Sequence, residues 1–208
     1  MNEILNQNEA KEYAYYKNAI KQSITEFMNY TQSEDIMGII LRAQIYIEKD
    51  LDLLLKKLLI HPDKISLQYF SAKLDAAYAL GAIDDDWYGS FRKFNKIRNK
   101  YAHDLNYTFT ESDFDDLVST LSKNSKEEYQ YNLSQEEWFN SLISSLGGES
   151  KNIDFKYKLR ILLSDFMLYM MQQHQSIEHV WKEIYCTKQI DILNEKIELL
   201  KILNSTPE

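Results

Sequence analysis

Residues 34–60 have the sequence EDIMGIILRAQIYIEKDLDLLLKKLLI, and this stretch decides the fold class. Its apolar residues recur at steps of three and four, which is the periodicity of an α-helix with one buried face. They are Ile36, Ile40, Ala43, Ile47, Leu51, Leu54 and Leu58. Because further apolar residues flank this stripe, we predict a long helix over 34–60 and expect it to be the most buried helix. Pro62 follows and disfavours continuation of the helix.

The rest of the chain also favours helices. Only two prolines and five glycines occur among 208 residues, and the hydrophobic content of 44% is ample for a core. Apolar periodicity and capping signals predict further helices over residues 8–31, 66–81, 85–103, 110–121, 134–147, 153–184 and 187–204. We therefore predict an all-α protein, an up-and-down helical bundle with additional C-terminal helices.

The domain organisation is predicted from one polar segment. Residues 123–133 are polar and charged, which is typical of a linker. This divides the chain into a helical domain over residues 1–122 and a C-terminal helical extension over 134–208. We expect the extension to pack on the bundle or to mediate oligomerisation.

Several functional classes are disfavoured. The chain has one cysteine, Cys186, which permits no internal disulfide and fits the reducing cytoplasm. The N-terminus is polar, so no signal peptide is evident, and no apolar run approaches membrane-spanning length. The sequence contains no phosphate-loop or dinucleotide fingerprint. We expect a cytoplasmic protein that does not associate with a membrane and needs neither metal nor cofactor.

The most informative functional feature is the segment Arg98-Asn99-Lys100-Tyr101-Ala102-His103. An arginine can hold a phosphate, and a histidine can transfer a proton near neutral pH, so the pair can support RNA cleavage without a metal. Residues five apart on a helix lie about 7.5 Å apart along the axis and roughly 140° around it. Arg98 and His103 therefore do not share a face, whereas Asn99 and His103 do. The helix must line a cleft, and a two-fold dimer would place each motif against its own copy.

The position of Arg98 on the predicted 85–103 helix allows two interpretations. Trp87, Phe91, Phe94, Arg98 and Tyr101 follow one another at helical steps, so Arg98 falls in line with an aromatic stripe. Ile97 could instead carry the stripe past it. Because an unpaired buried charge is costly, Arg98 could pair with an internal acid such as Glu48 or Asp52 and serve only the fold. His103 could likewise be an ordinary residue at a helix end.

The charge pattern gives a mixed indication. The net charge of −8 argues against a broad nucleic-acid-binding surface. The motif is nevertheless surrounded by the local cluster Arg92, Lys93, Lys96, Arg98 and Lys100. From this cluster we select Arg92, Lys96 and Lys100 as candidate RNA-binding residues, with Tyr101 as a base-stacking candidate. The alternative is that the lysines form a solvated helix face and that the tyrosine packs in the protein.

Three stretches carry a resemblance to a known family. Residues 41–52 (LRAQIYIEKDLD), 70–83 (FSAKLDAAYALGAI) and 96–104 (KIRNKYAHD) resemble the HEPN superfamily, in particular its mannitol-operon-repressor-like branch. The resemblance covers about residues 33–110. It implies an all-helical, HEPN-like bundle. Many members of the superfamily are metal-independent endoribonucleases of toxin–antitoxin, abortive-infection and CRISPR-type defence systems.

The resemblance assigns roles to the motif. It makes Arg98 the phosphate-binding residue, His103 the proton-transfer group and Asn99 the supporting polar residue. The implied reaction is attack of the RNA 2′-OH on the adjacent phosphate, which leaves a cyclic phosphate and a 5′-OH. The implied partners are RNA, with tRNA as one candidate, a second copy of the chain, and an antitoxin or regulatory protein. Repressor-like relatives carry a similar motif but act in transcriptional regulation, so a non-catalytic regulator or protein-interaction module is the alternative.

Overall fold

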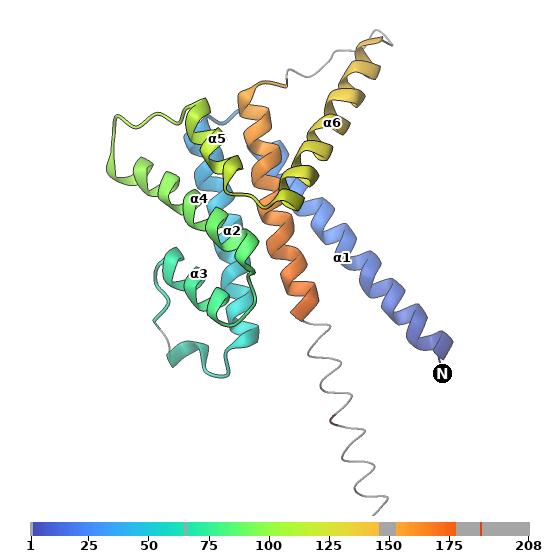
Figure 1. Ribbon diagram of the computed structural model, residues 1–208. Coiled ribbons are helices and arrows are strands. Elements are labelled where there is room, and N and C mark those ends of the chain that lie inside the picture. Colours follow the sequence, from blue (N-terminus) through green and yellow to red (C-terminus); the bar gives the residue numbers. More distant parts are fainter. Residues whose placement is uncertain (1, 65, 146–152, 178–187, 189–208) are drawn as a thin grey trace, which may run out of the picture. The chain divides into compact units, whose positions relative to one another are not determined.

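The structure is a computed structural model, which describes residues 2–64, 66–145, 153–177 and 188 (Figure 1). The chain divides into two compact units, residues 1–173 and 174–208. In the first unit the elements are α1 (Asn2–Tyr30), α2 (Ile36–Leu58), the short 3₁₀ helix η1 (Pro62–Lys64), α3 (Phe70–Ala79), α4 (Asp85–His103), α5 (Glu111–Ser119) and α6 (Lys123–Ser145). A further helix, here called the 155–173 helix, runs to the end of this unit. In the second unit, residues 174–177 and 188 are helical.

The all-α prediction is confirmed, since every regular element of the described residues is helical. The helix predicted over 187–204 lies outside the described residues except for residue 188. Within the described part, no helix combines the length and the apolar character that crossing a membrane requires.

Helix α2 forms the centre of the core, as its apolar stripe predicts. Seven of its apolar side chains are buried, namely Ile39, Ile40, Ala43, Ile47, Leu51, Leu54 and Leu55. The helix begins where the Asp35 side chain accepts a hydrogen bond from the Gly38 N–H at 2.7 Å. It ends at Leu58, shortly before Pro62. The predicted bounds were therefore too long by two residues at each end.

Helix α3 packs against both α2 and α4. It ends in a left-handed turn at Gly81 (φ 71°), which a side chain would strain. The turn reverses the chain into α4, whose first N–H groups are capped by Asp84 through a 3.0 Å hydrogen bond from the Trp87 N–H. The predicted bounds of this helix, 85–103, are confirmed.

The 155–173 helix joins the remaining helices of the first unit. Its Phe166 ring contacts Trp87 and Phe91 of α4 edge-on, at centroid distances of 5.2 and 5.1 Å. Its Asp165 accepts a hydrogen bond from Asn132 of α6. Its Arg160 donates hydrogen bonds to residues at the C-terminal end of α1. Residues from the predicted C-terminal extension therefore belong to the same core as α4.

The prediction of a linker over 123–133 was wrong, because α6 runs without a break from Lys123 to Ser145. The segment is polar but contains neither glycine nor proline, so its composition does not oppose a helix. It is anchored by Tyr129, which is 5% exposed and contacts the Phe114 ring of α5. One buried aromatic residue can hold a solvated helix against the bundle, and such a helix shows little apolar periodicity.

Candidate functional site

The candidate motif lies at the C-terminal end of α4, a helix whose sides have different environments. The core-facing side consists of Trp87, Ser90, Phe91, Phe94 and Ile97. Ile97 therefore carries the apolar stripe past Arg98, which is half-buried at its margin. This is the second of the two placements that the sequence allows for Arg98.

Arg98 has a neutral partner. Its Nη1 donates a 3.0 Å hydrogen bond to the Asn99 side-chain oxygen, and its Nε is buried without a partner. Within the described part of the chain, the guanidinium forms no ion pair. The alternative in which Arg98 pairs with Glu48 or Asp52 does not hold, because these carboxylates bind Lys73 of α3 at 2.8 and 2.9 Å. Since α3 packs directly on α2, its lysine reaches the two acids.

Asn99 binds Arg98 and shares a helix face with His103. Asn99 and His103 are four residues apart on one continuous helix, so they lie on the same face. Asn99 accepts the hydrogen bond from Arg98, which holds the arginine head toward this face. His103 is the last residue of α4 and is exposed, with no hydrogen-bond partner among the described residues. The arrangement offers a charged donor fork, an amide and an exposed imidazole along one side of a helix end.

Tyr101 stabilises the loop that follows the motif. Its hydroxyl accepts a 3.2 Å hydrogen bond from the Phe109 N–H, and its ring contacts Tyr107 edge-on at 4.8 Å. The ring is partly buried. The structure thus gives Tyr101 a packing role within the chain, which is the alternative to base stacking.

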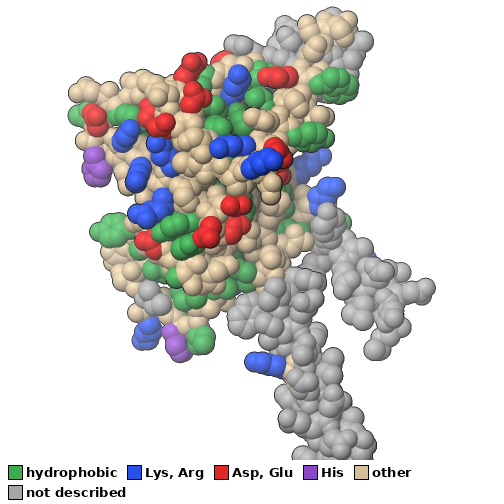
Figure 2. Space-filling view, in the orientation of Figure 1, with side chains coloured by type: hydrophobic (Ala, Val, Ile, Leu, Met, Phe, Trp, Pro, Cys, Tyr) green, Lys and Arg blue, Asp and Glu red, His purple; other side chains and the backbone are tan. Residues whose placement is uncertain are grey.

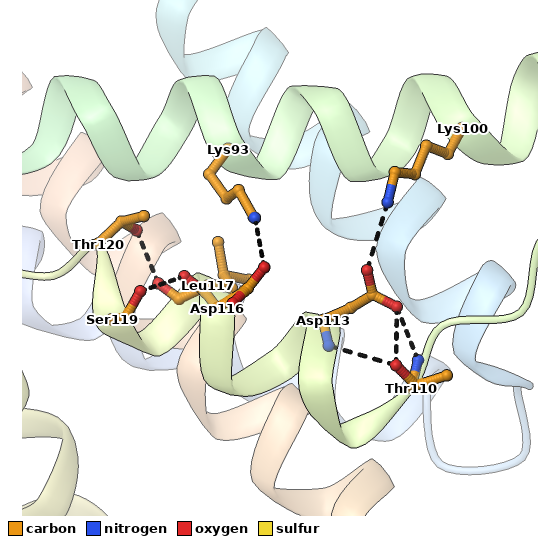
Figure 3. A network of polar contacts seen from close by, with 8 residues as sticks. All are labelled: Lys93, Lys100, Thr110, Asp113, Asp116, Leu117, Ser119 and Thr120. Atoms are coloured by element: carbon orange, nitrogen blue, oxygen red, sulfur yellow. Dashed lines mark hydrogen bonds and ion pairs between the residues drawn. The ribbon is translucent and has the colours of Figure 1, made fainter.

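Two of the five clustered cations are neutralised by α5 (Figure 3). Lys93 binds Asp116 at 2.9 Å and Lys100 binds Asp113 at 3.4 Å. Burial raises the pKa of Asp113, but hydrogen bonds from Thr110 and the charge of Lys100 outweigh it and lower that pKa overall. Lys100 also lies over the Tyr107 ring, with Nζ 4.9 Å from its centroid. Its charge is therefore partly compensated within the chain, although its side chain is 54% exposed.

Two other members of the cluster, Arg92 and Lys96, lie on one stripe of α4 with Asn99 and His103. Arg92, Lys96, Asn99 and His103 follow at steps of four, three and four, so they share one face. Arg92 and Lys96 are exposed and form no ion pair with the rest of the described chain. The Arg92 guanidinium lies 5.6 Å from the Tyr88 ring centroid. In Figure 2, Lys and Arg side chains gather over the region of α4, with acidic side chains close by.

These four residues, here called the α4 stripe, form the candidate site together with Arg98. The sequence predicted all five residues but not the two α5 carboxylates that bind the neighbouring Lys93 and Lys100. The signal was present as Asp113 and Asp116, whose spacing of three places them on one face of α5. Among the described residues, no group of three or more histidine, cysteine or acidic side chains is arranged to hold a metal ion.

Comparison with family models, curated proteins and solved structures finds no match to this chain. The HEPN assignment thus remains a resemblance carried by the residues quoted above.

Proposed function

We propose that this protein is a metal-independent endoribonuclease of HEPN type, a toxin or phage-defence effector acting in the cytoplasm. One observation carries the proposal. Arg98 has no acidic partner in the described part of the chain, and its guanidinium is held by Asn99 on the face that His103 shares. An arginine that served only the fold would be expected to face a carboxylate, as Lys73 does.

The proposed reaction follows from these side chains. The 2′-oxygen of a ribose attacks the adjacent phosphorus as its proton is removed, and the bond from phosphorus to the 5′-oxygen breaks as that oxygen gains a proton. The products are a 2′,3′-cyclic phosphate and a 5′-OH. Arg98 stabilises the negative charge that develops on the phosphoryl oxygens. His103 transfers a proton, and Asn99 keeps the guanidinium in place.

The α4 stripe suggests how RNA is held. Arg92 lies about two turns and Lys96 about one turn before Asn99 on the same face, and both can bind backbone phosphates. Lys100 contributes less in this proposal, because Asp113 already binds it. RNA binding should therefore weaken with salt through a small number of phosphate contacts.

The decisive experiment compares the wild type with His103→Ala and His61→Ala. Each purified protein is incubated with total RNA and with tRNA in the presence of a chelator, and the product ends are mapped. We expect cyclic phosphate ends from the wild type and from His61→Ala, which replaces another exposed histidine. No cleavage is expected from His103→Ala. Equal cleavage by all three proteins would refute the proposal, provided circular dichroism shows each to be folded.

Arg98 is tested by two substitutions. Arg98→Ala removes the charge. Arg98→Lys keeps the charge but loses the forked guanidinium, which can bind a phosphate while it also binds Asn99. We expect cleavage to fall by about a hundredfold or more in Arg98→Ala, since one electrostatic donor to the transition state is typically worth that much. Partial activity in Arg98→Lys would identify charge as the main contribution.

We further propose that the active form is a homodimer in which two motifs share one cleft. If Arg98 of one copy acts with His103 of the other, co-expression of Arg98→Ala with His103→Ala regenerates one intact pair per mixed dimer. Cleavage should then return to a measurable fraction of the wild-type rate. Mixed dimers that stay inactive would exclude a shared cleft and leave single-chain catalysis as the explanation.

The second candidate is a non-catalytic regulator or protein-interaction module. The observation that favours it is the neutralisation of Lys93 and Lys100 by α5, in a chain of net charge −8. A surface of mixed charge suits a protein partner, such as an antitoxin, better than a long nucleic acid. This candidate predicts no RNA cleavage by the wild type under any condition in which the protein is folded.

A further inference from the structure

A second polar site lies away from α4, between the end of α1 and the start of the 155–173 helix. Its cavity has a volume of about 410 Å³. Met28, Asn29 and Gln32 line it from the α1 side, and Asp154, Lys156, Tyr157 and Arg160 line it from the other side. The volume is within the range of small-molecule binding sites.

Arg160 is the unusual member of this lining because it is a buried cation with only neutral partners. It is 6% exposed. Its Nε donates to the Thr31 hydroxyl at 2.9 Å, and its Nη2 donates to the Met28 carbonyl oxygen. Its guanidinium carbon lies 5.5 Å from the centroid of the Tyr157 ring. Burial lowers the pKa of Arg160, and interactions with Tyr157 and with the charge of Asp154 offset this effect only in part.

An arginine this deeply buried is expected to face an anion, since the desolvation of its charge is otherwise uncompensated. No carboxylate of the described chain forms an ion pair with it. The acid in the lining, Asp154, has one oxygen engaged at the start of the helix, where it accepts a 2.8 Å hydrogen bond from the Tyr157 N–H. Asp154 contributes one negative charge to the lining, against two positive charges from Arg160 and Lys156.

The other lining groups extend this excess of donors. Lys156 is half-buried at the cavity, four residues before Arg160, so the two cations lie on one face of the helix. The amide side chains of Asn29 and Gln32 can donate hydrogen bonds from the opposite side. Two cations and two amides around one cavity are a set suited to an oxyanion with several acceptor oxygens.

We propose that this cavity binds a small phosphoryl anion, either inorganic phosphate or the phosphate of a nucleoside monophosphate. Arg160 and Lys156 supply the charge, and Asn29 and Gln32 supply further hydrogen bonds. The site is built from α1 and the 155–173 helix and shares no residue with the α4 stripe. Its occupation is therefore independent of whether α4 cleaves RNA.

The test uses isothermal titration calorimetry on the full chain at constant ionic strength. Inorganic phosphate and adenosine monophosphate are titrated into the wild type, with chloride as the reference anion. We expect saturable binding of at least one phosphoryl anion and none of chloride. Similar affinities would identify the phosphate group alone as the ligand, whereas tighter binding of the monophosphate would identify a phosphate ester. Absence of saturable binding by both phosphoryl anions would overturn the proposal.

Matched variants locate the binding. Lys156→Gln should weaken binding by about tenfold, the typical effect of losing one charge-assisted hydrogen bond. Lys158→Gln removes the same charge from the same helix outside the cavity and should leave the affinity unchanged. Asn29→Asp places a carboxylate in the lining without removing the support of Arg160, and it should abolish binding. Equal weakening by Lys156→Gln and Lys158→Gln, or binding that survives Asn29→Asp, would also overturn the proposal.

Discussion

Asp165 provides a direct test of how burial acts on a charge in this core. The residue lies on the 155–173 helix, where its Oδ1 accepts a 3.0 Å hydrogen bond from Asn132 of α6. Its Oδ2 is buried without a partner. Burial raises the pKa of Asp165 to about 7, the hydrogen bond from Asn132 opposes this effect, and the charge of Glu128 adds to it. Asp165→Asn removes the ionisation and keeps an acceptor for Asn132.

The magnitude follows from the pKa difference between the folded and unfolded states. A folded-state pKa of about 7 against an ordinary value of 3.8 means that the fold prefers the protonated acid. The stability that Asp165 contributes is therefore fully present below pH 4 and is lost as the pH rises to about 7. Between pH 5 and pH 8 the loss is about 3 kcal/mol. The asparagine variant does not undergo this loss, although its new N–H groups can cost about 1 kcal/mol if they lack an acceptor.

Urea unfolding, followed by circular dichroism at pH 5 and pH 8, measures the effect. We expect Asp165→Asn to be close to the wild type or slightly more stable at pH 5, where part of the loss has already occurred, and more stable than the wild type by about 3 kcal/mol at pH 8. Asp115→Asn removes the same charge from an exposed position of α5 and controls for the general effect of the net charge of −8. If the stability difference between Asp165→Asn and the wild type is the same at both pH values, the reasoning about burial is refuted.

Three further predictions concern stability and use the same unfolding measurement. Lys73→Met leaves two carboxylates without their shared cation and should cost about 2 kcal/mol; a change below about 0.5 kcal/mol would show that solvent already screens the pair. Thr110→Ala removes the cap of α5 and should cost about 1 kcal/mol, whereas Thr108→Ala, in the exposed loop before it, should be neutral. Gly81→Ala strains a left-handed turn and should destabilise the protein by about 1 kcal/mol. Gly89→Ala, in an open position of α4, should stabilise the protein by about 0.5 kcal/mol. Equal effects of the two substitutions would contradict the backbone argument.

Local chemistry made part of this structure predictable from the sequence. The bounds of α4 were correct because an aspartate caps the start and the aromatic stripe continues to the motif. The helix predicted to begin at residue 110 is indeed capped there, since Thr110 and Asp113, three residues apart, form reciprocal hydrogen bonds. Such signals need only residues within one turn of each other, so no knowledge of the tertiary arrangement was required.

Pairing between helices was not predictable in the same way. Arg98 was a candidate partner for the acids of α2, but Lys73 binds them instead, because α3 packs on α2. The linker prediction over 123–133 failed for a related reason. A largely solvated helix such as α6, held through Tyr129 and Asn132, carries almost no periodic signal of its own. In both cases the deciding contact joins residues far apart in the chain.

The contacts of α5 restrict the directions from which RNA could approach the motif on α4. Lys93 pairs with Asp116 and Lys100 with Asp113, an order that makes α4 and α5 antiparallel. Acids on α5 would repel a phosphate backbone approaching from that side. The exposed α4 stripe is the remaining approach to Arg98 and His103 along this helix, and it is only one residue wide. A ribonuclease with so narrow a stripe would need the second copy of a dimer to supply further cations. A site completed in this way fits a chain of net charge −8, whereas a broad basic surface does not.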